Sequence, residues 1–148
     1  MNRQEKKESK YKAFHALLKG LAETYENADE AAKQFLETTV GAALFYLPSS
    51  KALHYSGFIT QEALDSGNET QEHMFPRKIA AEGLLTDVPE TPEELMRQCD
   101  AIYLRFHIVT PKQNKDLCPH QKRDVFTTPD AAYEKAGIEL IPDPRLQN

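Results

Sequence analysis

The densest group of reactive side chains in the sequence is the pair Glu72-His73, with Pro76 and Arg77 just beyond it. A carboxylate can bind a hard cation, and an imidazole, with an ordinary pKa of about 6.5, can take a proton from water. Neighbouring residues of a strand point to opposite faces, so both side chains reach one point only where the strand ends or bulges. Pro76 would end the strand close to His73, so the side chains of Glu72 and His73 could reach one point. The alternative interpretation is an exposed loop that leads into a helix.

A second candidate group lies in residues 110–123, where a predicted strand runs directly into a predicted helix. Asn114 falls within that short helix, a position that is mildly unfavourable for asparagine. Its amide oxygen could orient a neighbouring loop or bind a cation, with Asp116 or His120 close by. Because surface asparagines are common, an exposed helix face is the alternative interpretation.

Together the two groups resemble the HNH, or His-Me finger, nucleases, in the style of small phage-encoded and homing proteins. Such sites place an acidic residue beside a histidine, often with a proline soon after, as in residues 72–76 (EHMFP). An asparagine then precedes a leucine, as in residues 114–117 (NKDL). The resemblance implies that His73 is the general base for water, that Glu72, Asn114 and His120 hold Mg²⁺ or Mn²⁺, and that Asn114 also orients the site.

Basic residues near both groups are candidates for contacts with nucleic-acid phosphates. Arg77 and Lys78 follow the first group and could clamp the scissile phosphate. Four more basic side chains could hold flanking phosphates: Lys112, Lys115, Lys122 and Arg123. The net charge of −5 argues against a protein that coats nucleic acid, so the expected DNA contacts are local. A solvated helix face is the alternative for the basic segment.

Apolar spacing predicts the elements that must position these residues. Residues 9–25 and 27–47 each carry a helical stripe, which indicates a helical hairpin over about 9–47, capped at Asn27 and ended by Pro48. Threonine caps predict short helices from Thr60, Thr91, Thr110 and Thr128, and a further helix covers about 77–85. Alternating apolar residues predict a strand over 101–109. Its other face, with Tyr103, Arg105 and His107, is interpreted as solvated, and a polar face near the cleft is the alternative.

These elements indicate a mostly helical α+β protein with a small sheet, expected to form a single domain over residues 1–148. A ββα-like catalytic region would span about 68–123. No apolar stretch approaches the ~18 residues that a membrane span requires, so we expect no membrane partner. The charged start, residues 1–12, runs into an amphipathic pattern in place of an apolar signal core, so we expect a cytoplasmic location. The two cysteines are too few for a disulfide scaffold, and buried thiols are the favoured interpretation.

Two functions are compatible with this organisation. The first is a metal-dependent endonuclease that hydrolyses DNA phosphodiester bonds with His73 as its base. The second is a non-catalytic interaction module that uses the N-terminal helical hairpin. The apolar stripe of the first helix fits either the body of the protein or a second copy of the chain, so a homodimer is left open.

Overall fold

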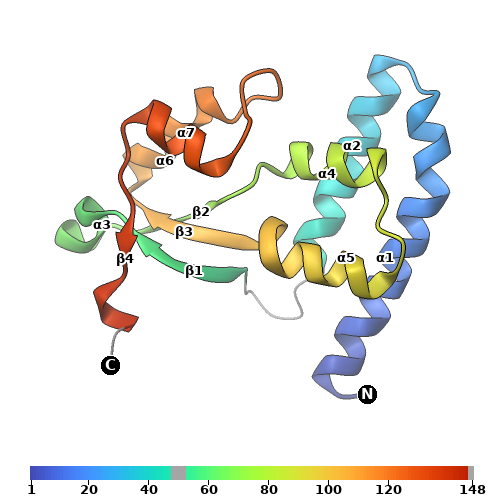
Figure 1. The fold of residues 1–148 in the computed structure, drawn as a ribbon, viewed down its shortest axis with the longest axis horizontal. Helices are drawn as coiled ribbons and strands as arrows, with labels where there is room; N and C mark the ends of the chain where they lie inside the picture. Colours follow the sequence, from blue (N-terminus) through green and yellow to red (C-terminus); the bar gives the residue numbers. More distant parts are fainter. Residues whose placement is uncertain (48–52, 147–148) are drawn as a thin grey trace. The chain divides into compact units, whose positions relative to one another are not determined.

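A computed structural model describes residues 1–47 and 53–146, and it confirms a mostly helical α+β protein with a small sheet. The chain forms two compact units (Figure 1). The helical unit comprises residues 1–53 and 76–104, and the sheet unit comprises residues 54–75 and 105–148. The expectation that both units belong to one domain stays a prediction.

The helical unit is built on an N-terminal hairpin. Its helices are α1 (Arg3–Glu26), α2 (Glu30–Tyr46), α4 (Arg77–Thr86), α5 (Pro92–Gln98) and the π-helical turn η1 (Cys99–Tyr103). Helix α4 packs against both α1 and α2, and α5 packs against α1. Leu18 and Val40, from the predicted stripes, are fully buried. The predicted hairpin is therefore confirmed, and its apolar stripes form the core of this unit.

The start of the hairpin and the cap of its second helix differ from the prediction. Helix α1 begins at Arg3, because Asn2 accepts a hydrogen bond from the Glu5 N–H while the Glu5 carboxylate accepts one from the Asn2 N–H. Asn27 ends α1, and Asp29 caps α2 in its place by accepting from Ala32 N–H. The predicted stop at Pro48 lies outside the described residues.

The sheet unit contains a four-stranded mixed sheet in the order β2-β3-β1-β4 within the described residues. Its strands are β1 (His54–Ile59), β2 (Thr70–His73), β3 (Arg105–Val109) and β4 (Ile141–Pro142). Strand β3 is central, parallel to β1 and antiparallel to β2. Strand β1 has an irregular register between Tyr55 and Ile59, and Gly57 there has φ of 85°, a conformation that glycine adopts readily.

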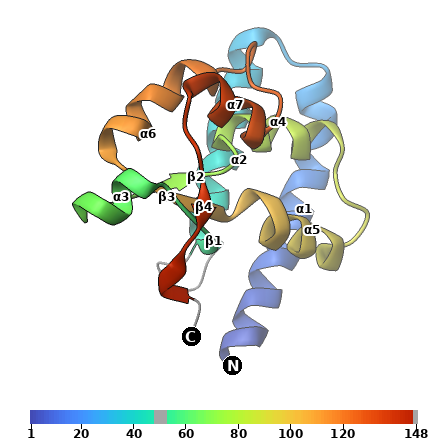
Figure 2. The same ribbon diagram turned by 60° about the vertical axis from the view of Figure 1, so that its left-hand side comes forward.

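Among the described residues, three helices and two 3₁₀ turns complete the sheet unit. They are α3 (Gln61–Ser66), α6 (Pro111–Leu117), η2 (Cys118–His120), α7 (Pro129–Ala136) and η3 (Pro144–Leu146). Helices α6 and α7 lie together on one side of the sheet (Figures 1 and 2). Their buried side chains Leu117 and Tyr133 pack with Val109 of β3. The side of the sheet under α7 is therefore a closed core.

All four predicted threonine N-caps are confirmed. Thr60, Thr91, Thr110 and Thr128 each accept a hydrogen bond from the backbone N–H three residues later. The last three of these are followed by proline at the start of the helix, where its missing N–H is not needed. Because these signals are local, sequence alone locates these helix starts.

The predicted strand over 101–109 is too long, and the burial predicted for its two faces is wrong. Residues 99–103 continue α5 as a π-helical turn, in which Leu104 N–H donates to Cys99 O at 2.8 Å. Ile102, expected in the core, is 42% exposed. His107, expected on a solvated face, is only 4% exposed. The reason is that α7 covers the second face, so both sides of β3 are buried.

Candidate functional site

The two segments singled out from sequence meet in the sheet unit. Strands β2 and β3 pair antiparallel in an unbroken register from Thr70 opposite Val109 to His73 opposite Phe106. Helix α6 follows β3 after Thr110 and contacts β2. Two strands and a helix thus adjoin one another, although residues 74–104 separate β2 from β3 in the sequence. In the chain, α4, α5 and η1 stand between β2 and β3, so the ββα-like region over about 68–123 stays a prediction.

Glu72 is a buried charged group at the meeting point of β2 and the segment after α6. It lies on β2 and is 3% exposed. The Tyr133 hydroxyl of α7 donates to its Oε2 at 2.5 Å, and the Gln121 amide, just after η2, donates to its Oε1. Both carboxylate oxygens of Glu72 therefore accept hydrogen bonds from side chains of the protein. Gln121, the residue after His120, is the contact between this segment and Glu72.

The surroundings of Glu72 shift the pKa of its carboxyl group and that of the neighbouring Tyr133 hydroxyl. Burial raises the pKa of Glu72 above its ordinary value, while the hydrogen bonds from Tyr133 and Gln121 oppose part of this rise. Burial, together with the nearby carboxylate, raises the pKa of Tyr133 far above its ordinary value. Tyr133 consequently keeps its proton and remains a hydrogen-bond donor at any physiological pH.

His107 lies directly opposite Glu72 in the ladder. Its Nδ1 is 2.6 Å from the Ser56 hydroxyl of β1, and its ring meets the rings of Tyr133 and Phe58 edge to face at 5.2 and 6.2 Å between centroids. Burial lowers the pKa of His107 to about 4, since the charged form is poorly solvated there. His107 is therefore neutral at pH 7 and is part of the core around Glu72.

His73, the predicted base, ends β2 and is half-buried. Its ladder partner is Phe106, whereas Glu72 pairs with His107, and the register contains no bulge between them. Alternation consequently directs Glu72 toward the side covered by α7 and His73 toward the opposite side. Strand β2 is an edge strand that ends at His73. Glu72 and His73 therefore both lie at its end, but their side chains point to opposite faces of the sheet.

The other predicted ligands lie on α6 and η2. Asn114 is half-buried, one turn before the fully buried Leu117, and its backbone oxygen accepts from the Cys118 thiol at 3.4 Å. His120 is half-buried in η2. The roles predicted for Asn114 and His120 stay predictions, and the contact from Gln121 to Glu72 brings this segment to the site.

The predicted phosphate-binding residues fall in both units. Arg77 and Lys78 begin α4 of the helical unit, where the Arg77 guanidinium lies 4.7 Å from the centre of the Phe45 ring. In the sheet unit, the four basic residues of the 112–123 segment are exposed: Lys112, Lys115, Lys122 and Arg123. Lys112 forms an ion pair with Asp116 at 2.8 Å. Their roles in DNA binding stay predictions.

The donor atoms of Glu72, its partner Gln121 and the predicted ligands Asn114 and His120 suit a hard cation better than a soft one. A carboxylate, two side-chain amides and one imidazole are offered by Glu72, Gln121, Asn114 and His120. Rotating the Gln121 amide by half a turn would present its oxygen, in place of its N–H, beside the Glu72 carboxylate. Across residues 1–47 and 53–146, no three His, Cys, Asp or Glu side chains already form a metal-binding group. A cation here would therefore depend on amide oxygens as well.

Sequence reasoning missed Gln121, Tyr133 and Ser56, and it placed His107 on a face of the predicted strand interpreted as solvated, with a polar face near the cleft as the alternative. Gln121 is the residue after the predicted ligand His120, so the segment was identified but the contact residue was not. Tyr133 falls on the apolar face of a correctly predicted helix, together with Ala132. His107 sits in a predicted strand among apolar residues, and this burial signal was available. Ser56 has no comparable signal, because β1 could not be assigned from its sequence.

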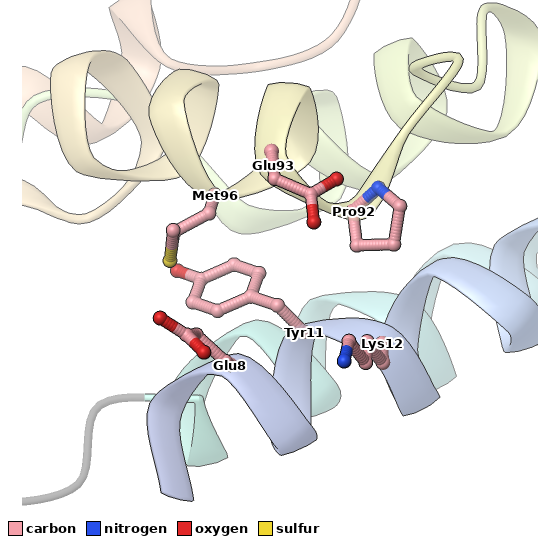
Figure 3. A pocket seen from close by; sticks show the side chains of 6 residues that line it. All are labelled: Glu8, Tyr11, Lys12, Pro92, Glu93 and Met96. Carbon is pink, nitrogen blue, oxygen red and sulfur yellow. The ribbon is translucent and has the colours of Figure 1, made fainter. Parts of the chain in front are cut away.

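A second recess lies within the helical unit, between α1 and α5, with a cavity volume of about 170 Å³ (Figure 3). It is lined by Glu8, Tyr11, Lys12, Pro92, Glu93 and Met96. Tyr11 is 2% exposed, and its hydroxyl is the buried side-chain atom that lacks a hydrogen bond in the described part of the chain. Burial raises the pKa of the neighbouring Cys99 thiol to about 12, so this cysteine stays protonated.

Both cysteines are free. Cys99 is buried, as expected, whereas Cys118 is exposed. The prediction that both thiols are buried is thus wrong for Cys118, because it follows the last turn of α6, where only Leu117 faces the core. Within the described residues, no helix has the length and apolarity needed to cross a membrane.

Comparison of the sequence with protein-family models finds no match, and comparisons with curated proteins and with solved structures find none either.

Proposed function

We propose that the sheet unit carries a metal-dependent endonuclease site that hydrolyses DNA phosphodiester bonds, of the HNH, or His-Me finger, type. The observation that carries this proposal is the contact between Glu72 and Gln121, which joins the end of β2 to the segment after α6. The antiparallel pairing of β2 with β3, followed by α6, supports it further.

In the proposed reaction, each residue has a distinct task. His73 at the end of β2 takes the proton of the attacking water. Glu72 would hold Mg²⁺ or Mn²⁺ together with Asn114, His120 or Gln121. When bound there, the cation would stabilise the charge that develops on the leaving oxygen. Because Glu72 and His73 face opposite sides of an edge strand, the substrate phosphate would lie across the strand end.

DNA is the proposed partner, and its binding is expected to be local. Lys115, Lys122 and Arg123 are exposed on the same segment as Gln121, so they could contact phosphates that flank the scissile bond. Arg77 and Lys78 are further candidates. Two free thiols, one of them exposed, support a reducing and therefore cytoplasmic setting as part of the proposal.

Conversion of supercoiled plasmid to nicked or linear DNA tests the proposal. We expect conversion with Mg²⁺ or Mn²⁺, none with a chelator, and recovery when the cation is added back in excess. Failure to cleave double-stranded DNA, single-stranded DNA and RNA with either cation would contradict an endonuclease function.

A second candidate function rests on an exposed aromatic stripe of α2. Phe35, Phe45 and Tyr46 are 70%, 54% and 73% exposed, on the face opposite the buried Leu36, Val40 and Leu44. Large exposed apolar groups on one helix face favour association, here with a second copy of the chain. A dimer mass in sedimentation equilibrium, combined with no cleavage, would favour this interaction module. A monomer mass would contradict the homodimer.

A further inference from the structure

We propose that the end of α2, with neighbouring residues of α1 and α4, forms a binding surface for single-stranded nucleic acid. This aromatic–basic surface is defined by five exposed side chains of the helical unit: Lys10, Phe45, Tyr46, Arg77 and Lys78. The inference rests on the proposed function, because it takes nucleic acid as the partner and names the form of it that this surface binds. Bases stack on the two rings, and phosphates contact the three basic groups around them.

The aromatic part of the surface is the pair Phe45 and Tyr46 at the end of α2. The two side chains are 54% and 73% exposed, and their rings meet edge to face at 5.6 Å between centroids. Unpaired bases stack on exposed rings of this kind, whatever their sequence, because every base has a π-face. A duplex keeps its base faces within its own stack, so the two rings favour single strands.

Two basic side chains contact this aromatic pair. The Arg77 guanidinium lies 4.7 Å from the centre of the Phe45 ring, and Lys10 Nζ donates to the Tyr46 carbonyl oxygen at 3.3 Å. Gly41 helps to place Arg77, because a Cβ built at Gly41 would already touch Arg77 Cβ at 3.4 Å. Any side chain longer than that of alanine would push the start of α4 away from α2. Positive charge is therefore held beside both rings.

The charge near the rings on α2 and α4 is positive. Residues 31–46 of α2 include one acidic residue, Glu37, which is 2% exposed, so the exposed face of this stretch carries no carboxylate. Helix α4 adds Arg77 and Lys78 against Glu82. The surface consequently attracts a polyanion.

Helix α1 extends the positive charge away from the rings. Lys6 is exposed one turn before Lys10 on the same face, whereas the acidic residues in the first two turns of α1 fall on the opposite side. Two copies of the chain paired through this surface would bring their basic groups together, which like-charge repulsion opposes. A phosphate backbone neutralises these groups instead, so nucleic acid suits the surface better than a second copy does.

Fluorescence anisotropy of a labelled oligothymidylate of about 20 nucleotides tests the surface. A chelator is present throughout, so that binding is measured without cleavage. We expect the wild type to bind this probe more tightly than a duplex of the same length, and Tyr46→Ala to bind it at least about 5-fold more weakly. Phe35→Ala is the matched control, because Phe35 is 70% exposed on the same helix but lies three turns before Tyr46. The control should bind as the wild type does.

A tryptophan reporter distinguishes stacking from other causes of lost affinity. The chain contains no tryptophan, so Tyr46→Trp places a single indole in the surface. The oligothymidylate should quench its fluorescence, because a base stacks on the ring. The fluorescence of Phe35→Trp should not change.

The outcomes separate this inference from the proposed function. Equal affinity of the wild type and Tyr46→Ala, or an unquenched Tyr46→Trp, would overturn the surface even if plasmid DNA is cleaved. Binding that Tyr46→Ala weakens, in a protein that cleaves no nucleic acid, would support the surface and contradict the endonuclease. Equal weakening in Phe35→Ala, together with a dimer mass that either change abolishes, would assign the aromatic side chains to a second copy of the chain and overturn the proposal.

Discussion

Replacing His73 with alanine is expected to lower the rate of Mg²⁺-dependent plasmid cleavage by about 10²–10⁴-fold, the usual contribution of a positioned general base. The imidazole is the side chain at the end of β2 that can accept a proton from water at pH 7. Because His73 is half-buried at a strand end, its loss should leave the fold intact. Single-turnover cleavage under excess enzyme gives the rate directly.

Two variants make this result specific. His54→Ala removes another histidine of the same sheet, from the exposed start of β1, and should cleave at the wild-type rate. His73→Gln keeps a polar side chain that cannot act as a base, and it should be as inactive as alanine. Added imidazole should restore part of the rate to His73→Ala alone. Undiminished cleavage by His73→Ala would contradict the assignment.

The buried His107 is expected to make folding strongly dependent on pH. Its pKa is about 4 in the folded protein, against about 6.5 in the unfolded chain. Between these values the unfolded chain binds a proton that the folded protein excludes. The contribution of neutral His107 is therefore fully present above pH 6.5 and is lost as the pH falls toward 4. A shift of this size corresponds to about 3 kcal/mol in the free energy of unfolding.

Urea unfolding at several pH values between 7 and 4 measures this effect. The reference is His107→Asn, whose amide can replace the contact to Ser56 but does not titrate. The difference in free energy between the two proteins isolates His107, because the raised pKa of Glu72 acts in the opposite direction in both. The wild type should lose stability relative to the variant as the pH falls. Parallel curves for the two proteins would show that His107 is not a buried neutral group.

Elements defined by local chemistry were predictable from the sequence. Thr91, Thr110 and Thr128 start helices because each cap and its proline act within one turn. Gly67 and Gly137 end helices because both adopt a left-handed conformation, with φ of 68° and 69°. The hairpin of α1 and α2 followed from stripes of apolar residues at helical spacing.

Features that depend on tertiary packing were not predictable in the same way. Residues 99–103 form a helical turn although the apolar residues from 101 on alternate as in a strand. The helical turn buries both Cys99 and Leu104 in the core. The apposition of Glu72 and Tyr133 depends on α7 returning to the sheet, and no pattern in the chain specifies which face it covers. Sequence therefore identified Glu72 and the segment around His120, whereas the donors to Glu72 emerged only from the fold.

The most direct test of the cation site is Mn²⁺ binding by the Glu72→Gln variant. This change keeps the shape of the side chain and an oxygen for Tyr133, and removes the negative charge that would hold the cation. Glu62→Gln is the matched control, since Glu62 also accepts a hydrogen bond from a glutamine, Gln113, at 3.2 Å. We predict that the wild type and Glu62→Gln bind a single Mn²⁺ and that Glu72→Gln binds it at least about 10-fold more weakly. Equal affinity in all three proteins would contradict a cation site at Glu72.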